Sequence, residues 1–167
     1  MSRTVLVIRH GIAEEPVDAA IAGRNDARRE LTKEGWHKMR QAAQGLATLV
    51  DGIDLLVSSP LVRAVQTADC VAEAFPDAKR AQHPGLSPGV DHSALLQWVM
   101  RQKGTLALVG HEPDLSEWIG YMVSGAPRSL VQMKKGAVCK LEMPEQAVPG
   151  EAQITWHLSS KQLGMLG

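Results

Sequence analysis

The stretch Thr4-Val5-Leu6-Val7-Ile8-Arg9-His10-Gly11 decides the fold that we predict for this chain. Its apolar and β-branched residues predict a buried strand that ends at a cation, an imidazole and a glycine. In open α/β sheets, ligands bind just beyond the carboxyl ends of the strands. Arg9 and His10 are therefore candidates for a binding site. Gly11 would let the chain turn sharply or let the backbone come close to a ligand. Taken alone, the stretch also fits a strand that simply ends in polar residues.

The composition is typical of a globular protein with one domain, which we expect to span residues 1–167. Of the 167 residues, 44% are hydrophobic and 22% charged, and 18 basic residues balance 18 acidic ones. Zero net charge gives no reason to expect nucleic acid or a membrane as partner, so any anion site must be local. Cys70 and Cys139 lack metal-ligand spacing and predict buried thiols. No signal-peptide or membrane-spanning pattern is found, so we expect a cytoplasmic protein.

The rest of the chain alternates predicted strands and helices. Helices are expected where amphipathic patterns follow capping residues, such as Thr32, or Ser59 followed by Pro60. The predicted strands are residues 54–58, 105–109, 137–143 and 153–158, the last two as an antiparallel hairpin, and the predicted helices are residues 32–50, 59–75, 91–102 and 112–123. Residues 12–30 and 81–90 lack periodicity and are expected to be irregular. This order predicts a three-layer α/β/α sandwich with a mainly parallel sheet.

Three of these strands end in residues that suit one kind of chemistry. Arg9 and His10 follow the first strand, Arg63 lies in the first turns of the helix after the second, and His111 follows a later strand. If the strands are parallel neighbours, these four side chains meet at one edge of the sheet. Arginine forks bind phosphate oxygens, and the helix N-terminus after His111 would favour the same anion. One histidine can then be the nucleophile while the other donates hydrogen bonds to the phosphoryl group.

The same residues predict the geometry of the site. We expect His10 and His111 on opposite sides of one pocket with Arg9 and Arg63 between them, and phosphate, sulfate or vanadate bound there. The second ring nitrogen of His10 should donate to a backbone carbonyl or a similar acceptor, which would fix its tautomer. No metal or other cofactor is expected, because the histidines lie about a hundred residues apart without a carboxylate cluster.

Three motifs resemble those of the histidine phosphatase superfamily, whose members share a phosphoglycerate mutase-like fold. They are Arg9-His10-Gly11, the segment from Ser58 to Ala68 (SSPLVRAVQTA), and Val109-Gly110-His111-Glu112-Pro113. The resemblance covers essentially the whole chain. It implies that His10 is the phosphorylated nucleophile and that Arg9, Arg63 and His111 complete the phosphate pocket. Gly11 and Glu112, within the first and third motifs, are expected at the substrate.

Within the superfamily, the chain is most similar to the SixA-type phosphohistidine phosphatases. The short length and the segment Leu31-Thr32-x-x-Gly35 carry this resemblance. Those proteins have R-P-L-T before the first long helix, whereas this chain has Arg29-Glu30-Leu31-Thr32. Arg29 is therefore a candidate substrate-binding residue, and a solvated loop arginine is an almost equally good interpretation.

One departure from larger members of the family bears on the substrate. They carry a glutamate general acid in the segment after the second motif, where this chain has Leu86-Ser87-Pro88. An alcohol leaving group needs a proton from such an acid, but an imidazole can take its proton from solvent. The remaining candidates for an acid, each more often a solvated carboxylate or a helix cap, are Glu14, Glu15, Asp18 and Asp91.

The resemblance implies a metal-independent phosphatase that acts on phosphohistidine in a protein, such as a histidine-containing phosphotransfer domain. A second hypothesis is a phosphatase of small phosphate esters or short polyphosphate. A third, of another class, is a relative that binds phosphate or a phosphorylated protein without turnover. A relative of that kind would be expected to lose one of the four central residues, and all four are present.

Overall fold

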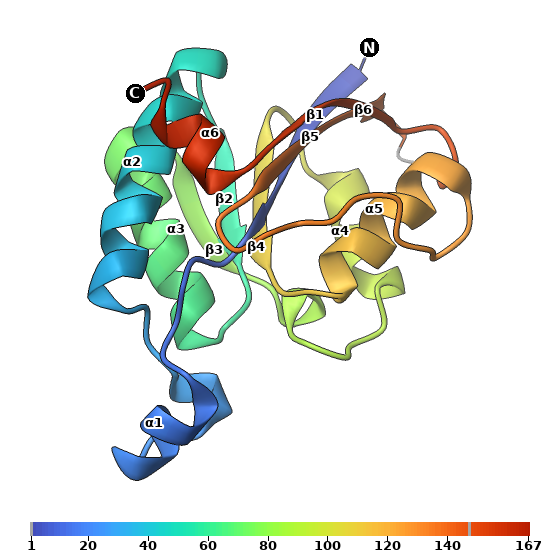
Figure 1. The fold of residues 1–167 in the computed structure, drawn as a ribbon. Helices are drawn as coiled ribbons and strands as arrows, with labels where there is room; N and C mark the ends of the chain where they lie inside the picture. The colour runs from blue at the N-terminus through green and yellow to red at the C-terminus, as the bar shows by residue number, and fades with distance from the viewer. Residues whose placement is uncertain (1, 147) are drawn as a thin grey trace.

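The computed structural model describes residues 2–146 and 148–167. One six-stranded sheet with the order β3-β2-β4-β1-β5-β6 runs through the middle of the fold (Figure 1). Its strands are β1 (Ser2–Arg9), β2 (Leu55–Ser58), β3 (Lys79–Gln82), β4 (Leu106–Gly110), β5 (Val138–Pro144) and β6 (Gln153–Leu158). The first four pair in parallel, whereas β5 pairs antiparallel with both β1 and β6. The mainly parallel sheet and the terminal hairpin are thus confirmed.

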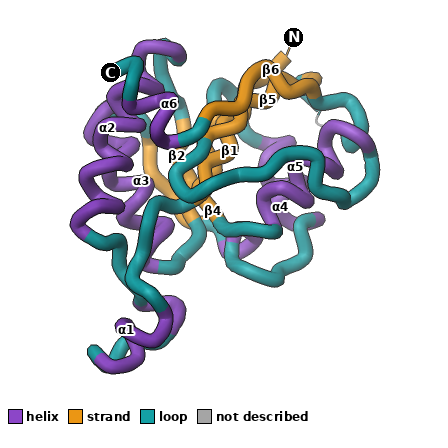
Figure 2. Tube along the Cα trace, viewed as in Figure 1, coloured by secondary structure: helices purple, strands orange, loops and turns teal. Residues whose placement is uncertain are grey.

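Helices cover both faces of the sheet and complete the predicted sandwich (Figure 2). One layer contains α2 (Lys33–Leu49), α3 (Val62–Ala74) and the short α6 (Ser160–Gly164), and the other contains α4 (Ser93–Arg101) and α5 (Asp114–Ser124). None of the helices in the described residues has the length and hydropathy needed to cross a bilayer.

The alternation of side chains along β1 explains why it lies inside the sheet. Leu6 and Ile8 pack into the core cluster under α2 and α3, whereas Val5 and Val7 pack into the cluster under α4 and α5. All four are fully buried. A strand that is apolar on both faces is stable only where both faces are covered, as in a parallel sheet between two helix layers.

The register of the sheet brings the three predicted strand ends together. Arg9 lies opposite Gly110 in the β1–β4 ladder, and Ser58 lies opposite Val109 in the β2–β4 ladder. The strands β1, β4 and β2 therefore end at the same level. The residues that follow them share one edge of the sheet, as expected for an α/β ligand site.

Several local predictions were wrong. The segment 12–30 is not a plain loop: it contains α1 (Pro16–Ile21) and the 3₁₀-helix η1 (Asp26–Arg28), and it projects from the body of the fold (Figure 1). The region expected to be irregular contains the end of β3 and the 3₁₀-helix η2 (Pro84–Leu86). β3 has the sequence KRAQ and lies at the edge of the sheet, so it lacks the apolar pattern that predicts a strand.

Candidate active site

His10 lies directly after β1, and its ring is oriented by the backbone next to it. The residue is 6% exposed, and Nδ1 donates a hydrogen bond to the carbonyl oxygen of Gly11 at 2.7 Å. This confirms the backbone acceptor predicted for the second nitrogen, and it leaves the lone pair on Nε2. Burial lowers the pKa of His10 to about 3, and the charges of His111, Arg63 and Arg9 act in the same direction. The ring is therefore neutral near pH 7 and has a free nitrogen for nucleophilic attack.

His111 follows β4 and packs against His10, with the ring centroids 5.2 Å apart and the planes inclined by 49°. The two histidines meet as predicted, but their rings lie side by side rather than being separated by the arginines. Nε2 of His111 is 2.6 Å from the hydroxyl oxygen of Ser59. Burial, followed by the charge of Arg63, lowers the pKa of His111 to about 4. This ring is also neutral near pH 7.

Ser59 was predicted to cap the helix that follows it, and this prediction was wrong. α3 begins at Val62, its N-cap position is Leu61, and no side chain caps it. The Ser59 hydroxyl instead accepts a hydrogen bond from the backbone N–H of Leu61 at 3.3 Å and faces His111. The serine and proline before α3 thus form a turn that brings a hydroxyl to the histidine.

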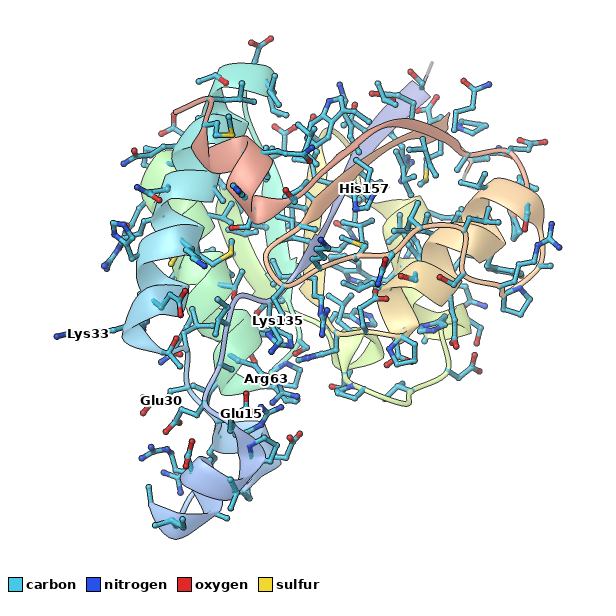
Figure 3. All side chains as sticks on the ribbon, viewed as in Figure 1. Glu15, Glu30, Lys33, Arg63, Lys135 and His157 are labelled. Carbon is cyan, nitrogen blue, oxygen red and sulfur yellow. The ribbon has the colours of Figure 1, made fainter. Side chains whose placement is uncertain are left out.

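Arg63 lies in the first turn of α3 and is 4% exposed. Its Nη1 donates to the backbone carbonyl of Asp26 at 2.7 Å, and its Nη2 lies 3.3 Å from the carboxylate of the same residue. Figure 3 shows Arg63 at the end of α3 that faces the segment carrying Glu15 and Glu30. Two donors of the guanidinium are therefore held by a segment predicted to be a loop.

Arg9 ends β1 and is anchored on the other side of the site. Its Nη1 donates to the carbonyl of Met133 at 2.9 Å, in the segment that leads into β5. Burial lowers the pKa of Arg9, and the charge of Glu112 opposes this effect. Both site arginines therefore use one part of the guanidinium for position and keep other donors for a ligand.

Three buried side-chain donors in this region have no hydrogen-bond partner among the described residues. They are Nε of Arg9, Nε of Arg63 and Nδ1 of His111. An unpaired buried donor costs roughly 1–3 kcal/mol, so three such donors on residues whose charges all act on His10 call for an acceptor. A phosphoryl group supplies several anionic oxygens, which is the acceptor that arginine and imidazole donors bind best.

Gly11 and Glu112, which were expected at the substrate, each make hydrogen bonds within the protein. The Gly11 N–H donates to the hydroxyl of Thr67 at 3.0 Å, and a β-carbon at Gly11 would lie 2.6 Å from Met39 Cγ. Close packing therefore explains the glycine. The Glu112 carboxylate accepts hydrogen bonds from the backbone N–H and the hydroxyl of Ser116. This carboxylate therefore satisfies one backbone N–H in the first turn of α5.

Arg29 lies near the site without contacting the histidines. It donates to the carboxylate of Asp26 at 3.0 Å and to the carbonyl of Glu14 at 2.7 Å. Its charge contributes to lowering the pKa of Arg63 and of His111. The structure therefore places Arg29 within electrostatic reach of the phosphate pocket and ties it to the segment that holds Arg63.

The carboxylates proposed as general acids are engaged elsewhere or exposed. Glu14 pairs with Arg24, which lowers its pKa, and Asp91 accepts hydrogen bonds from Ser93, which lowers its pKa as well. Glu15 and Asp18 are exposed residues at the start of α1. A general acid needs a raised pKa, so the two shifted carboxylates are poorly suited to that role.

Two residues that organise the site were missed by sequence reasoning. Ser59 could have been found, because the motif that contains it also contains Arg63. Asp26 lies in a charged segment without periodicity, and no local signal relates it to an arginine 37 positions later. Within the described residues, neither His10 nor His111 belongs to a group of three side chains placed to hold a metal ion.

Comparisons with known proteins identify the family and the fold. Residues 5–87 match the model of the histidine phosphatase superfamily, branch 1. An uncharacterized protein of Picosynechococcus is 33% identical over 161 residues, which cover 92% of this chain and 89% of that protein. The solved structure of the protein histidine phosphatase SixA complexed with tungstate has a TM-score of 0.80 at 23% identity and covers 96% of this chain and 99% of its own.

A phosphoserine phosphatase from Entamoeba histolytica, solved with phosphoserine, also has a similar fold. Its TM-score is 0.70 at 16% identity, and the match covers 96% of this chain and 99% of that one. One fold thus occurs in proteins named for different substrates, so the fold alone does not identify the substrate. The match to the family model, together with two histidines and two arginines gathered at one sheet edge, shows that this chain belongs to the histidine phosphatase superfamily.

Proposed function

We propose that this protein is a phosphohistidine phosphatase, which removes the phosphoryl group from a histidine of a substrate protein. The observation that carries the proposal is the set of unpartnered donors on Arg9, Arg63 and His111 around a neutral His10. These donors can hold the three peripheral oxygens of a phosphoryl group while Nε2 of His10 faces the phosphorus. The fold shared with SixA supports the same function.

The reaction takes place in two displacements. Nε2 of His10 attacks the phosphorus, the P–N bond of the substrate breaks, and the leaving imidazole takes a proton from solvent. Water then attacks the phosphorus, the bond to His10 breaks, and the proton of that water leaves with phosphate or solvent. Arg9, Arg63 and Nδ1–H of His111 stabilise the charge on the phosphoryl oxygens in both steps. Their fixed positions also keep the group in line for attack.

The protonation state of the carboxylate near the site favours an imidazole over an alcohol as the leaving group. Asp26 is the carboxylate whose charge raises the pKa of His111. Burial acts to raise the pKa of Asp26 itself, but the neighbouring Arg63 and Arg29 lower it below its usual value. It is therefore ionised near pH 7 and has no proton to give to an alcohol. An imidazole does not need one from the protein, because it is basic enough to be protonated by water.

The test compares phosphate release from a phosphohistidine peptide, phosphoserine and p-nitrophenyl phosphate, each with and without EDTA. A general acid contributes about 10²–10⁴ to ester hydrolysis, so we expect phosphohistidine to react at least about a hundredfold faster than phosphoserine. His10→Ala is the control for turnover at this site. Faster release from phosphoserine would favour an ester phosphatase. Phosphate binding without turnover of any substrate would favour a binding protein, and loss of activity in EDTA would contradict a metal-independent reaction.

A further inference from the structure

A groove opens beside the site and is bordered by four lysines. They are Lys38 of α2, Lys134 and Lys135 of the segment before β5, and Lys161 of α6. We call it the lysine groove. Its volume is about 980 Å³, which is far more than one phosphate needs. In sequence, Lys134-Lys135 is too short to predict an anion patch, and only the fold brings the other two lysines to it.

The lysine groove shares Arg9 with the active site, although His10, Arg63 and His111 do not line it. Arg9 and Gly11, the neighbours of His10 in the chain, form part of its wall. The segment that carries Lys134 and Lys135 is fixed to these residues: Arg9 Nη1 donates to the Met133 carbonyl at 2.9 Å, and the Gly136 N–H donates to the His10 carbonyl at 3.0 Å. The backbone that carries the two lysines therefore keeps a defined position relative to His10.

The charge of the groove is largely uncompensated. Lys38 pairs with Glu34 at 2.7 Å, but Lys134, Lys135 and Lys161 form no ion pair in residues 2–146 and 148–167. The chain as a whole has zero formal net charge, so this concentration of positive charge is local. It favours an anionic group that extends beyond the phosphoryl group itself.

The remaining wall indicates what kind of anion fits. Ile12 and Met165 add apolar surface, and Met165 is 76% exposed. Methionine is common at surfaces that accept varied peptide side chains. No aromatic residue lines the groove in the described part of the chain, so it offers no platform for stacking a base. A polyphosphate chain would leave the apolar wall unused, whereas an acidic peptide segment uses both surfaces.

We propose that the lysine groove binds an acidic segment of the substrate protein that lies next to the phosphorylated histidine. This inference rests on the proposed function and specifies its partner: a protein whose phosphohistidine is flanked by Asp or Glu together with apolar side chains. Arg9 and Arg63 hold the phosphoryl group, and the lysines select the chain that carries it. Screened lysine–glutamate pairs are individually weak, so two or three of them together give a preference of about tenfold.

The test uses two phosphohistidine peptides that differ only in four flanking residues, glutamate in one and glutamine in the other. We expect kcat/KM to be about tenfold higher for the glutamate peptide at low salt, and the ratio to fall toward one in 0.5 M salt. The double variant Lys134→Gln/Lys135→Gln should lower this ratio to near one. Lys33→Gln is the matched control, because Lys33 lies outside the groove and points away from the molecule (Figure 3); it should keep the ratio.

A second measurement does not depend on turnover. The unphosphorylated glutamate peptide, followed by fluorescence anisotropy, should bind the wild-type protein about tenfold more tightly than the glutamine peptide, and the double variant should lose this difference. Tighter binding of the glutamate peptide without hydrolysis of either peptide would support the proposed role of the groove and contradict the proposed function. Equal hydrolysis and equal binding of the two peptides would reject the groove. Binding of short polyphosphate that depends on Lys134 and Lys135, without binding of the glutamate peptide, would also overturn the peptide assignment.

Discussion

The hydroxyl oxygen of Ser59 lies 2.6 Å from Nε2 of His111, and this contact determines which nitrogen of the histidine serves the phosphoryl group. The same oxygen accepts from the Leu61 N–H, and among the described residues the hydroxyl proton has no acceptor other than Nε2, so the hydroxyl donates to Nε2. A neutral imidazole that accepts at Nε2 carries its proton on Nδ1. Nδ1 is the buried atom of His111 without a partner in the described residues. Ser59 is therefore a positioning residue that presents Nδ1–H as a donor.

Ser59→Ala should lower kcat about tenfold while changing KM little, because it removes the group that selects the tautomer of His111. The nitrogen chemical shifts of His111 in NMR report the tautomer directly. In the wild-type protein they should show a proton on Nδ1, and in the variant a mixture of both tautomers. A lower kcat with the Nδ1–H tautomer fully retained would show that Ser59 acts only through packing.

His10→Ala should abolish turnover but leave part of the phosphate binding, since Arg9, Arg63 and His111 remain. His111→Ala should slow the reaction and leave the nucleophile in place. After brief reaction with labelled substrate and a quench without acid, the label should be found on His10 by peptide mapping, in the wild-type protein and in His111→Ala. Label on His111, or persistent turnover in His10→Ala, would mean that the two histidines are assigned in the wrong order.

Arg63→Lys should lower kcat/KM about a hundredfold or more, as removal of an oxyanion donor usually does. Lysine keeps the charge but loses the planar fork, which contacts Asp26 with one part and, in the function that we propose, a phosphoryl oxygen with another. Arg40→Lys is the matched control, because Arg40 is an exposed residue of α2 that pairs with Glu73. A near wild-type rate for Arg63→Lys would place Arg63 outside the phosphate pocket.

The grouping of the four central residues could be predicted because it depends on the order of strands and helices, which the sequence pattern reveals. Arg9, His10 and His111 each follow an apolar strand, Arg63 belongs to the helix after another, and parallel strands end at one edge of a sheet. The way these side chains are held could not be predicted. Asp26 reaches Arg63 from a segment whose short helices have no apolar periodicity, and such contacts depend on how the segment packs.

Some contacts could not be predicted because one local pattern can serve two purposes. Ser59 before Pro60 resembles a helix cap, yet the hydroxyl is used by His111. Glu112 lies next to a site residue, and its carboxylate accepts hydrogen bonds from Ser116. Gly11 resembles a turn glycine and is needed for close packing against Met39. In each case the structure shows a contact that the local pattern does not reveal.

Asp26→Asn should tighten the binding of inorganic phosphate about five- to tenfold at low salt, since it removes a negative charge next to the anion site. The backbone carbonyl of Asp26 still accepts from Nη1 of Arg63 at 2.7 Å, so the arginine keeps its anchor. Titration calorimetry measures the effect, and Asp77→Asn, on the exposed turn before β3, serves as the control. Weaker binding would show that the carboxylate is needed to hold Arg63 in place.

The two buried histidines should make the free protein less stable as the pH falls. Burial lowers the pKa of His10 to about 3 and that of His111 to about 4, whereas a histidine in an unfolded chain titrates near ~6.5. Between these values the unfolded state binds protons that the folded state does not. The free energy of unfolding therefore has its full value above pH 6.5 and decreases as the pH falls toward 4. The slope is at most roughly 1.4 kcal/mol per pH unit for each histidine.

Urea unfolding in phosphate-free buffer between pH 7 and pH 5.5 measures this dependence of the unfolding free energy on pH, in a range above the main titration of the carboxylates. The partly buried His83 and His157, whose pKa is also lowered by burial, add to the total slope. The difference between the wild-type protein and His10→Gln isolates the contribution of His10, and identical slopes would show that His10 accepts a proton in the folded state as readily as in the unfolded chain.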